Sequence, residues 1–437
     1  MQYVLFVMLA LLLLVSFLVS NKDILAPSVI ANAMFLFCCF FTVLNTEKWG
    51  IIDFHIETVV FILASLFTFT IGCIIGDWGI RSDCRNYSFC DIKTRFSLTN
   101  GKLIKISKLG WSIIALFLAI SLAIYTKETY LLSIKGGNTK GLSYMIYYAR
   151  RAQLNLNTNV SSLAQHLFLM CKSISYVLIF CFFYNVFLER FRLKYLIFWF
   201  PTVIYSGMII LSSGRLLFIN LFVFIFIVGI LVYKKTNKKF NLGTGKILKK
   251  GVALLVLFFT LFFLYGFFVR KDTMGIFDTI SIYAGSGIYA LDRFLSAPIK
   301  RGDFFGSETL ISIYLILEKL GFETPSLYSP REFVSFSNDY QTNIFTALRR
   351  YFVDYRVIGT LIFLLILGIV YGILYNRIRN NPYVGLKIIL AGILYEPIVE
   401  FAIEERFLLK VCSLSMLYEF IYISFLFFLV FKRIKCR

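Results

Sequence analysis

Arginine residues gather between positions 269 and 356, at spacings that would let several of them share one ligand. Arg349 and Arg356 are seven residues apart, which places them on one face of a helix, and Arg350 follows the first of them. Planar guanidinium groups bind phosphate oxygens through paired hydrogen bonds, which lysine does less well. The pattern therefore predicts a site for a phosphate or pyrophosphate group. The residues predicted to bind it here are Arg293, Asn343, Arg349, Arg350, Tyr351 and Arg356.

Two arginines also have a simpler explanation. Arg350 and Asp354 are four residues apart, which is the spacing of an ordinary helical ion pair. Arg215 is a further predicted phosphate ligand, and it follows a tight turn between two apolar runs. A charged side chain in such a place often extends to the lipid headgroups instead.

Carboxylates recur within one apolar run. Glu396, Glu400 and Glu404 are four residues apart and would stack on one helix face. A carboxylate inside a membrane is unfavourable, so a functional role is the default reading, and Glu400 is a candidate base. The alternative is an internal ion pair with Arg406, with Lys172 or with the arginines of residues 269–356.

The elements that must position these residues are membrane helices. Hydrophobic residues make up 59% of the 437-residue chain and charged residues only 16%, and the mean hydropathy is +0.79. This composition excludes a secreted enzyme, a cytosolic enzyme and a disordered chain. Apolar runs long enough to cross a bilayer as helices predict an all-α polytopic protein with about 11 transmembrane helices in one membrane domain, residues 1–437. The runs are approximately 2–19, 24–44, 56–76, 109–126, 163–188, 195–211, 216–233, 251–268, 357–375, 388–405 and 412–431.

The positive charges predict how these helices are oriented. One alternating set of loops carries 25 of the 45 Lys and Arg residues, in far fewer positions than the other set. The positive-inside rule makes that set cytoplasmic, so the net charge of +21 reflects orientation rather than a nucleic-acid partner. The long insert 269–356 and the N-terminus then lie outside.

The insert is expected to hold short helices that do not cross the membrane. Residues 276–297 predict a pair of re-entrant or surface helices, broken at Gly285-Ser286-Gly287. Residues 309–320 predict a similar helix, and another should begin near Thr342 or Asn343 and lead into the next span.

Three short motifs connect the turn and the insert to a known family. They are Ser213-Gly214-Arg215, then Tyr283-x-x-Ser286-Gly287 with Asp292, then Asn343-Ile344-Phe345-Thr346-x-x-Arg349 with Tyr351, Asp354 and Gly359. With these motifs and its topology the chain resembles the Wzy-type O-antigen polymerases, the oligosaccharide repeat-unit polymerases. It departs from the family pattern where Arg350 replaces a Pro and Ser213 replaces a Gly, and where Arg356 stands near the usual Phe-Gly.

The resemblance implies a GT-C-like glycosyltransferase in the bacterial cytoplasmic (inner) membrane, with its active site facing the periplasm. A growing glycan would leave undecaprenyl pyrophosphate with inversion and join the non-reducing sugar of an incoming lipid-linked repeat unit. The implied partners are undecaprenyl-pyrophosphate-linked oligosaccharides and membrane lipid, with a chain-length regulator left open. No metal or nucleotide motif occurs, so no metal ion and no cofactor is expected.

The implied reaction needs groups that stabilise the leaving pyrophosphate and a base for the acceptor hydroxyl. Arg215, Arg293, Arg349 and Arg350 would supply the positive charge. The candidate bases are Asp339, Asp354, Glu400 and His166. A histidine near a helix end is more often a surface residue, and Asp354 has its alternative in an ion pair with Arg350.

Other function classes remain open at this point. An O-antigen ligase would use similar arginines but typically carries a histidine in its large outer loop, and residues 269–356 contain none. A flippase or transporter of lipid-linked sugars would have charges in both halves of the chain and balanced loops. A structural membrane scaffold would not need so many arginines on one side.

Overall fold

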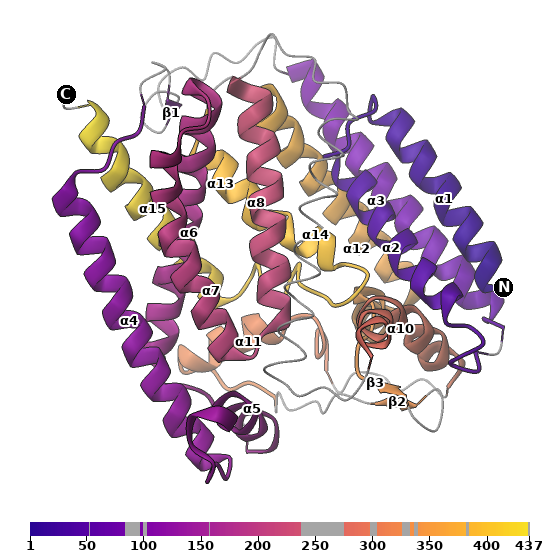
Figure 1. Cartoon of the computed structure of the whole chain (residues 1–437). Helices are drawn as coiled ribbons and strands as arrows, with labels where there is room; N and C mark the ends of the chain where they lie inside the picture. Colours follow the sequence, from indigo (N-terminus) through magenta and orange to yellow (C-terminus); the bar gives the residue numbers. More distant parts are fainter. Residues whose placement is uncertain are drawn as a thin grey trace. The chain divides into compact units, whose positions relative to one another are not determined.

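The computed structural model describes residues 1–51, 53–83, 97–98, 103–156, 158–236, 275–297, 304–325, 333–335, 340–381 and 384–435. These residues are predominantly α-helical, and the chain divides into two units, whose elements are labelled in Figure 1. The first unit comprises Met1–Phe89, Met274–Asn381 and Leu394–Met416. The second comprises Cys90–Thr273, Pro382–Ile393 and Leu417–Arg437. That the chain forms a single membrane domain stays a prediction.

The first unit is built on long helices that lie side by side (Figure 1). They are α1 (Gln2–Val19), α2 (Pro27–Leu44), α3 (Ile56–Asp83) and α12 (Ala347–Asn380). The insert contributes further elements to this unit. They are α10 (Ile276–Ser296), α11 (Ile311–Lys319) and the antiparallel strands β2 (Val334–Ser335) and β3 (Gln341–Thr342). The short helix α14 (Glu396–Glu400) and the beginning of α15 (Leu414–Lys435) complete the unit.

Glycines bring α3 and α12 into close contact. Gly72 and Gly76 on α3 face Gly368 and Gly372 on α12, so each helix offers a small residue every fourth position. A Cβ added at Gly72 would lie only 2.3 Å from the carbonyl oxygen of Leu365. Membrane helices use such patterns to pack backbone against backbone. This contact fixes α12, which carries most of the predicted phosphate ligands.

Ion pairs hold the insert against the N-terminal loops at one end of the first unit. The amino group of Met1 lies 2.9 Å from Asp53, and Lys48 donates a hydrogen bond to Asp278 on α10. That bond to Asp278 raises the pKa of Lys48. The loop 45–55 and the insert therefore share one end of the unit, as the predicted loop alternation requires.

The other end of the first unit joins three further loops. Tyr375 donates a hydrogen bond to Asp23, and Arg379 lies 2.6 Å from Asp77. Asp23, Asp77 and Arg379 come from loops 20–23, 77–108 and 376–387, which the charge pattern grouped together as cytoplasmic, and Tyr375 ends the predicted run 357–375. The grouping is confirmed within this unit, whereas the side that each end faces stays a prediction.

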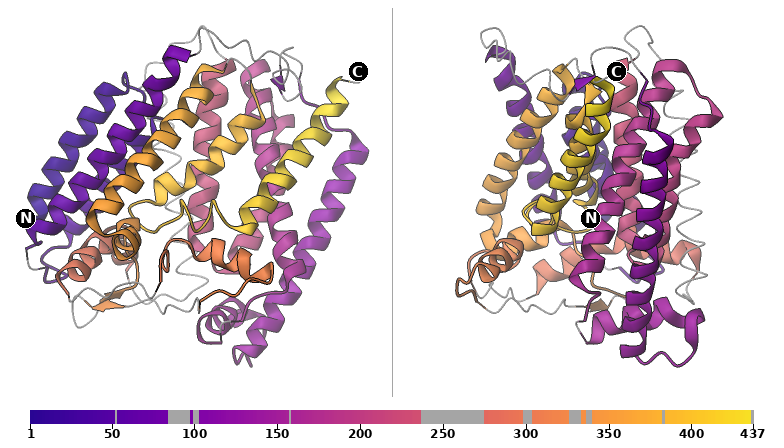
Figure 2. Two further views of the ribbon diagram at one scale, coloured as in Figure 1. Left: turned by 180° about the vertical axis from the view of Figure 1, so that it is seen from behind. Right: turned by 90° about the vertical axis from the view of Figure 1, so that its left-hand side faces the viewer.

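The second unit is also a bundle of long helices. Its main members, α4 (Lys108–Lys135), α6 (Ser162–Glu189), α7 (Phe200–Ser212) and α8 (Arg215–Thr236), run side by side (Figure 2). Ser107 and Ser161 cap α4 and α6, because their hydroxyls accept from backbone N–H groups of the first turn. The remaining elements are η1 (Gly141–Tyr144), α5 (Met145–Asn155), η2 (Leu193–Trp199), β1 (Ser97–Leu98) paired with β4 (Val384–Gly385), α13 (Leu386–Leu394) and most of α15.

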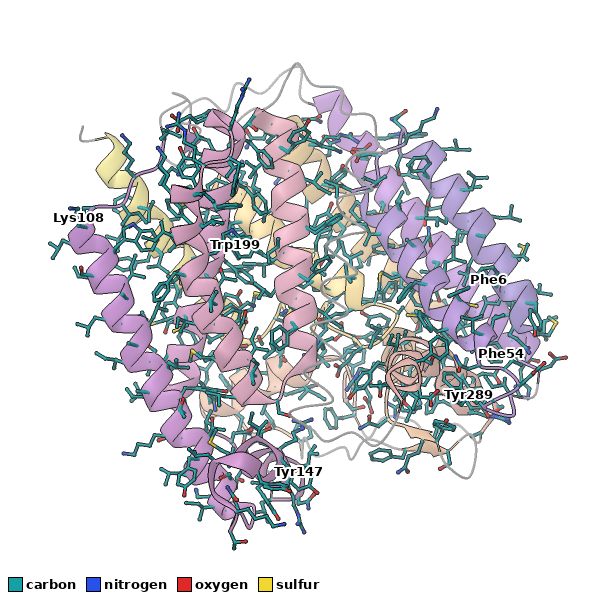
Figure 3. The ribbon with its side chains drawn as sticks, viewed as in Figure 1. Phe6, Phe54, Lys108, Tyr147, Trp199 and Tyr289 are labelled. Carbon is teal, nitrogen blue, oxygen red and sulfur yellow. The ribbon has the colours of Figure 1, made fainter. Side chains whose placement is uncertain are left out.

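Long helices of both units keep large apolar side chains on their outer surfaces. On α1 the exposed fractions of Val7 and Leu18 are 56% and 54%, and on α4 those of Leu109 and Leu116 are 69% and 64%. Figure 3 shows α4 in side view, from Lys108 at its start to Tyr147 of α5 near its other end. Such continuous apolar surfaces are unfavourable in water and match the hydrocarbon of a bilayer.

Eight helices of the described residues are long and apolar enough to cross a membrane. They are Gln2–Val19, Pro27–Leu44, Ile56–Trp78, Lys108–Lys135, Ser162–Glu189, Leu193–Ser212, Leu216–Thr236 and Ala347–Asn380. The chain is thus an all-α multi-pass membrane protein, as its composition predicted. A shorter apolar helix, Leu414–Val430, replaces the last predicted run, and the run 251–268 lies outside the described residues.

Two predicted elements take another form. The run 388–405 is not one helix, because α13 ends at Leu394 and Pro397 sits in the first turn of the separate helix α14. Residues 276–297 are not a broken pair but the single helix α10. Its glycines serve packing instead of a turn: a Cβ added at Gly285 would lie 2.8 Å from the backbone nitrogen of Thr42 on α2.

Candidate functional site

Two arginines at the start of α12 share one carboxylate. Arg349 and Arg350 are the third and fourth residues of this helix. Arg350 donates to the carboxylate of Glu308 at 2.8 Å and to its backbone carbonyl at 3.0 Å. Arg349 donates to the same carboxylate oxygen at 3.3 Å. All three side chains are at least 85% buried, so this group is held largely away from water.

Aromatic rings enclose the Arg349 guanidinium. Its central carbon lies 4.8 Å from the ring centres of both Phe294 and Phe345, and the two rings are 6.3 Å apart. Cation–π contact of this kind stabilises a cation and fixes its plane. We call these five residues, Glu308, Arg349, Arg350, Phe294 and Phe345, the arginine cluster.

The arginine cluster lies at an unfavourable place for positive charge. The aligned peptide dipoles of a helix make its N-terminus positive, so that anions rather than cations are stabilised there. Arg349 and Arg350 add two positive charges to this end, where Glu308 pairs with both and the buried Glu405 also interacts electrostatically with Arg350. Two guanidinium groups that share one carboxylate at a helix N-terminus could bind an anion in its place.

Asp354 fixes the turn that carries Glu308. Its carboxylate accepts from the backbone N–H groups of Glu308 and Thr309 and from the hydroxyls of Ser307 and Thr309, at 2.7–3.2 Å. The sequence-based ion pair between Arg350 and Asp354 is therefore wrong, because each side chain takes partners from the 307–309 turn instead. Asp354 is a positioning residue in this arrangement, since its oxygens are engaged by four donors.

The two motif-bearing halves of the insert meet in the first unit. Ser286 on α10 hydrogen-bonds to Thr342 at 2.8 Å, although 56 residues separate them in the sequence. Beside it, a Cβ added at Gly287 would lie 3.5 Å from Ile344 and 3.6 Å from the backbone nitrogen of Thr346. The two motifs of the insert are thus neighbours in space.

A second polar group forms where α10 meets the start of α3. Asp292 accepts from the backbone N–H of His55 at 3.0 Å and lies 3.1 Å from the Nδ1 atom of its ring. On the next position of α10, Arg293 donates to the Tyr289 hydroxyl at 2.8 Å. The ring of Tyr289 in turn packs 6.5 Å from that of Phe54, and both are labelled in Figure 3.

The acidic residues of α14 and of the segment after it pair with nearby basic residues. Arg406 lies 3.4 Å from Glu400 and 2.8 Å from Glu404, and Lys410 donates to Glu396. The alternative of internal ion pairs is confirmed for this run. Glu400 is fully buried, and Arg406 is its nearest basic partner among the described residues.

Tyr351 and Arg356 act within α12 rather than on its surface. Tyr351 is fully buried and donates to Glu405 at 3.0 Å, so it positions the 401–413 segment. Arg356 has a left-handed backbone with φ 59°, which kinks the helix between the insert and the span, and its side chain lies over Phe352. Asn343 is half-buried in the segment that leads into α12, and Asp339 lies outside the described residues.

The remaining predicted site residues belong to the second unit. The tight turn is confirmed, because α7 ends at Ser212, Ser213 is left-handed with φ 58°, and Arg215 begins α8. The Nδ1 atom of His166 lies 3.0 Å from the hydroxyl of Tyr422. A meeting of Arg215 or His166 with the arginine cluster stays a prediction.

Lys172 shows that the second unit has its own buried ion pair. Its ammonium group lies 2.8 Å from Glu419 on α15, and both side chains are 96% buried. The ammonium group also lies over the ring of Tyr176. Lys172 is therefore a partner of Glu419.

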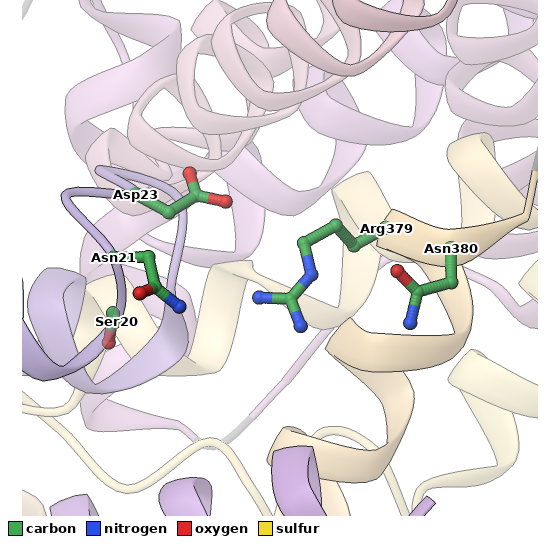
Figure 4. Close-up of a pocket in the computed structure, with 5 residues that line it drawn as sticks. All are labelled: Ser20, Asn21, Asp23, Arg379 and Asn380. Carbon is green, nitrogen blue, oxygen red and sulfur yellow. The ribbon is translucent and has the colours of Figure 1, made fainter. Parts of the chain in front are cut away.

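A pocket opens at the opposite end of the first unit from the arginine cluster. It has a volume of about 530 Å³ and is lined by Ser20, Asn21, Asp23, Arg379 and Asn380 (Figure 4). The guanidinium of Arg379 points toward the loop that carries Asn21 and Asp23. Arg379 is paired with Asp77, and the residues that line this pocket include one guanidinium group, whereas the arginine cluster has two.

Comparison of the chain with family models, with curated proteins and with solved structures finds no match. The site is therefore interpreted from its own geometry and from the motifs in the sequence.

Proposed function

We propose that the protein polymerises lipid-linked oligosaccharide repeat units, with a growing glycan on undecaprenyl pyrophosphate as the donor. The observation that supports this best is the arginine cluster, in which Arg349 and Arg350 share the single carboxylate of Glu308 at a helix N-terminus. A pyrophosphate would take the place that Glu308 now holds between the two guanidinium groups. Arg293, on the neighbouring helix α10, is a further ligand in this proposal.

The proposed reaction breaks the bond between the sugar anomeric carbon and the pyrophosphate oxygen. The acceptor hydroxyl attacks that carbon from the opposite face, so that the configuration inverts. Negative charge develops on the leaving oxygen, where preorganised cations lower the barrier most. The rings of Phe294 and Phe345 still hold the Arg349 guanidinium when Glu308 is displaced, so this group needs little reorganisation.

Guanidinium groups carry the charge stabilisation in this proposal, and no metal ion takes part. Transfer should therefore continue in the presence of EDTA. A strict requirement for a divalent cation would contradict this part of the proposal.

An O-antigen ligase is the second candidate, and one contact favours it. Ligases typically carry a histidine in the large outer loop, and the insert itself contains none. His55 nevertheless reaches the insert from another loop, because its ring lies against Asp292 of α10. A histidine is thus available beside the insert for either kind of glycosyl transfer.

Deletion of the gene in its source organism distinguishes the candidates. We expect surface polysaccharide that carries single repeat units and no long chains, and we expect the intact gene to restore the ladder of lengths on a gel. Loss of every capped form would instead indicate a ligase or a flippase. Reporter fusions after residues 240 and 320 should report the cytoplasm and the exterior respectively, and the reverse would overturn the orientation.

A further inference from the structure

We infer that His55 is the base that takes the proton from the acceptor hydroxyl, with Asp292 as its positioning residue. This inference rests on the proposed function and assigns a catalytic role within it. The contact joins the loop before α3 to α10, across 237 residues of sequence.

The geometry sets the tautomer of the His55 ring. Asp292 is only 2% exposed, and an ionised carboxylate can only accept hydrogen bonds. The Nδ1 atom of His55 lies 3.1 Å from the Asp292 carboxylate and must therefore carry the hydrogen in this bond. The Nε2 atom then holds its lone pair, which is the form that can accept a proton.

Two further features suit a base. The His55 side chain is 47% exposed, so a substrate can reach its ring, while the second Asp292 oxygen accepts the backbone N–H of His55 at 3.0 Å and fixes the residue. A carboxylate that orients an imidazole in this way also stabilises the imidazolium that forms during the reaction. No other contact of the Nε2 atom is found among the described residues.

The neighbouring positions of α10 connect His55 to the phosphate ligands. Successive helix residues point about 100° apart, because a helix has 3.6 residues per turn. Asp292 contacts His55 and Phe294 contacts Arg349, and two positions are about 200° apart around a helix, so these contacts lie on nearly opposite faces of α10. Arg293 lies between them within the same turn. In the proposal it is the phosphate ligand that links the base on one face to the arginine cluster on the other.

Two of the other candidate bases, Asp354 and Glu400, are less accessible. Four donors engage Asp354, and Glu400 is fully buried beside Arg406. In the proposed step the hydroxyl proton passes to Nε2 of His55 as the oxygen bonds to the anomeric carbon. The bond to pyrophosphate breaks, its electron pair leaves with the phosphate oxygen, and the imidazolium later releases its proton to water.

The test uses the full-length protein in lipid nanodiscs, with undecaprenyl-pyrophosphate-linked repeat units as donor and acceptor. Asp292→Asn keeps the size of the side chain, but its amide would donate to Nδ1 and leave the hydrogen on Nε2. We expect single-turnover transfer to fall by about 100-fold to 10,000-fold, with donor affinity changed less than about threefold. The transfer rate of His55→Ala should fall by a similar factor, and added imidazole should restore at least part of that rate.

Asp278→Asn is the matched control, because it breaks the neighbouring contact of α10 with Lys48 and should leave transfer unchanged. Transfer by Asp292→Asn and His55→Ala within about tenfold of an active wild type would overturn the inference. So would a loss of donor binding in both variants without rescue by imidazole, which indicates a structural role. A wild type that transfers no lipid-linked sugar would overturn the proposed function itself, and the role of His55 would fall with it.

Discussion

The two ends of α12 both carry arginines, but in opposite electrostatic settings. At the C-terminal end, Arg379 pairs with Asp77 at 2.6 Å and lies over Tyr375, while Arg377 is exposed. Cations are favoured there, because the C-terminus is the negative end of the helix dipole. Each of these arginines is explained by local stability or by the predicted orientation of the chain.

At the N-terminal end the same residue type is explained less easily. Arg349 and Arg350 are largely buried, they share the one carboxylate of Glu308, and the helix dipole opposes them. A structural ion pair would need only one of the two. We infer from the difference between the ends that position and pairing, rather than residue type, mark Arg349 and Arg350 as candidates for ligand binding and Arg379 as a residue of folding.

Removal of the N-terminal arginines should have the largest effect. We expect Arg349→Ala or Arg350→Ala to lower the transfer rate of the purified protein by about 100-fold to 1,000-fold, as for other losses of one charge-stabilising group. Arg377→Ala, on the exposed C-terminal end of the same helix, is the matched control and should retain the wild-type rate. Equal losses in all three variants would remove the distinction between the two ends.

Overpacking the contact between α3 and the middle of α12 should destabilise the whole helix, and with it both of its ends. The Cβ added by Gly72→Ala would lie 2.3 Å from the carbonyl oxygen of Leu365, which is too close for two atoms that are not bonded. We expect a loss of about 1–3 kcal/mol in stability from this overpacking, seen as a lower thermal midpoint in detergent. Gly207→Ala adds the same methyl group where no atom lies within 4 Å, and it should not lower the midpoint.

Removing the charge of the carboxylate at each end of α12 should distinguish the two ends by their affinity for pyrophosphate. Glu308 competes with an anion for Arg349 and Arg350, so Glu308→Gln should bind inorganic pyrophosphate about tenfold more tightly, because a nearby unit charge is worth a few kcal/mol at most near a protein surface. Titration calorimetry measures this affinity. Asp77→Asn at the other end should leave it unchanged, and weaker binding by Glu308→Gln would mean that Glu308 orients the arginines for the ligand.

The smallest effect on transfer is expected at the 307–309 turn, which carries Glu308 of the arginine cluster. Asp354→Asn removes the charge from a carboxylate that accepts from Ser307, Glu308 and Thr309. We expect a loss of about 1–3 kcal/mol or less in stability and only a modest change in transfer. Thermal unfolding and the transfer assay check the two parts, and a loss of transfer as large as that of Arg349→Ala would make Asp354 a catalytic residue.

Local patterns in the sequence predicted much of this molecule. Hydrophobic runs identified most membrane helices, and the charge pattern grouped loops that meet at each end of the first unit. The pairing of Ser286 with Thr342 places two predicted motifs side by side. These successes depend on short-range periodicity and on charge counts, which the sequence displays directly.

The long-range partners could not be predicted in this way. Glu308 lies 41 residues from Arg349 and belongs to no motif or helical face that would link them. His55 meets Asp292 across 237 residues, and neither position indicates the other. The break before Glu396 was missed because residues 388–405 form one largely apolar run, although Pro397 was a signal that could have revealed it.

Binding of undecaprenyl pyrophosphate to the protein in nanodiscs tests the central claim most directly. We expect wild type and Arg377→Ala to bind with equal affinity, and Arg349→Ala and Arg350→Ala to bind at least about tenfold more weakly. Equal binding by all four proteins would contradict the claim that the arginine cluster holds a lipid-linked pyrophosphate.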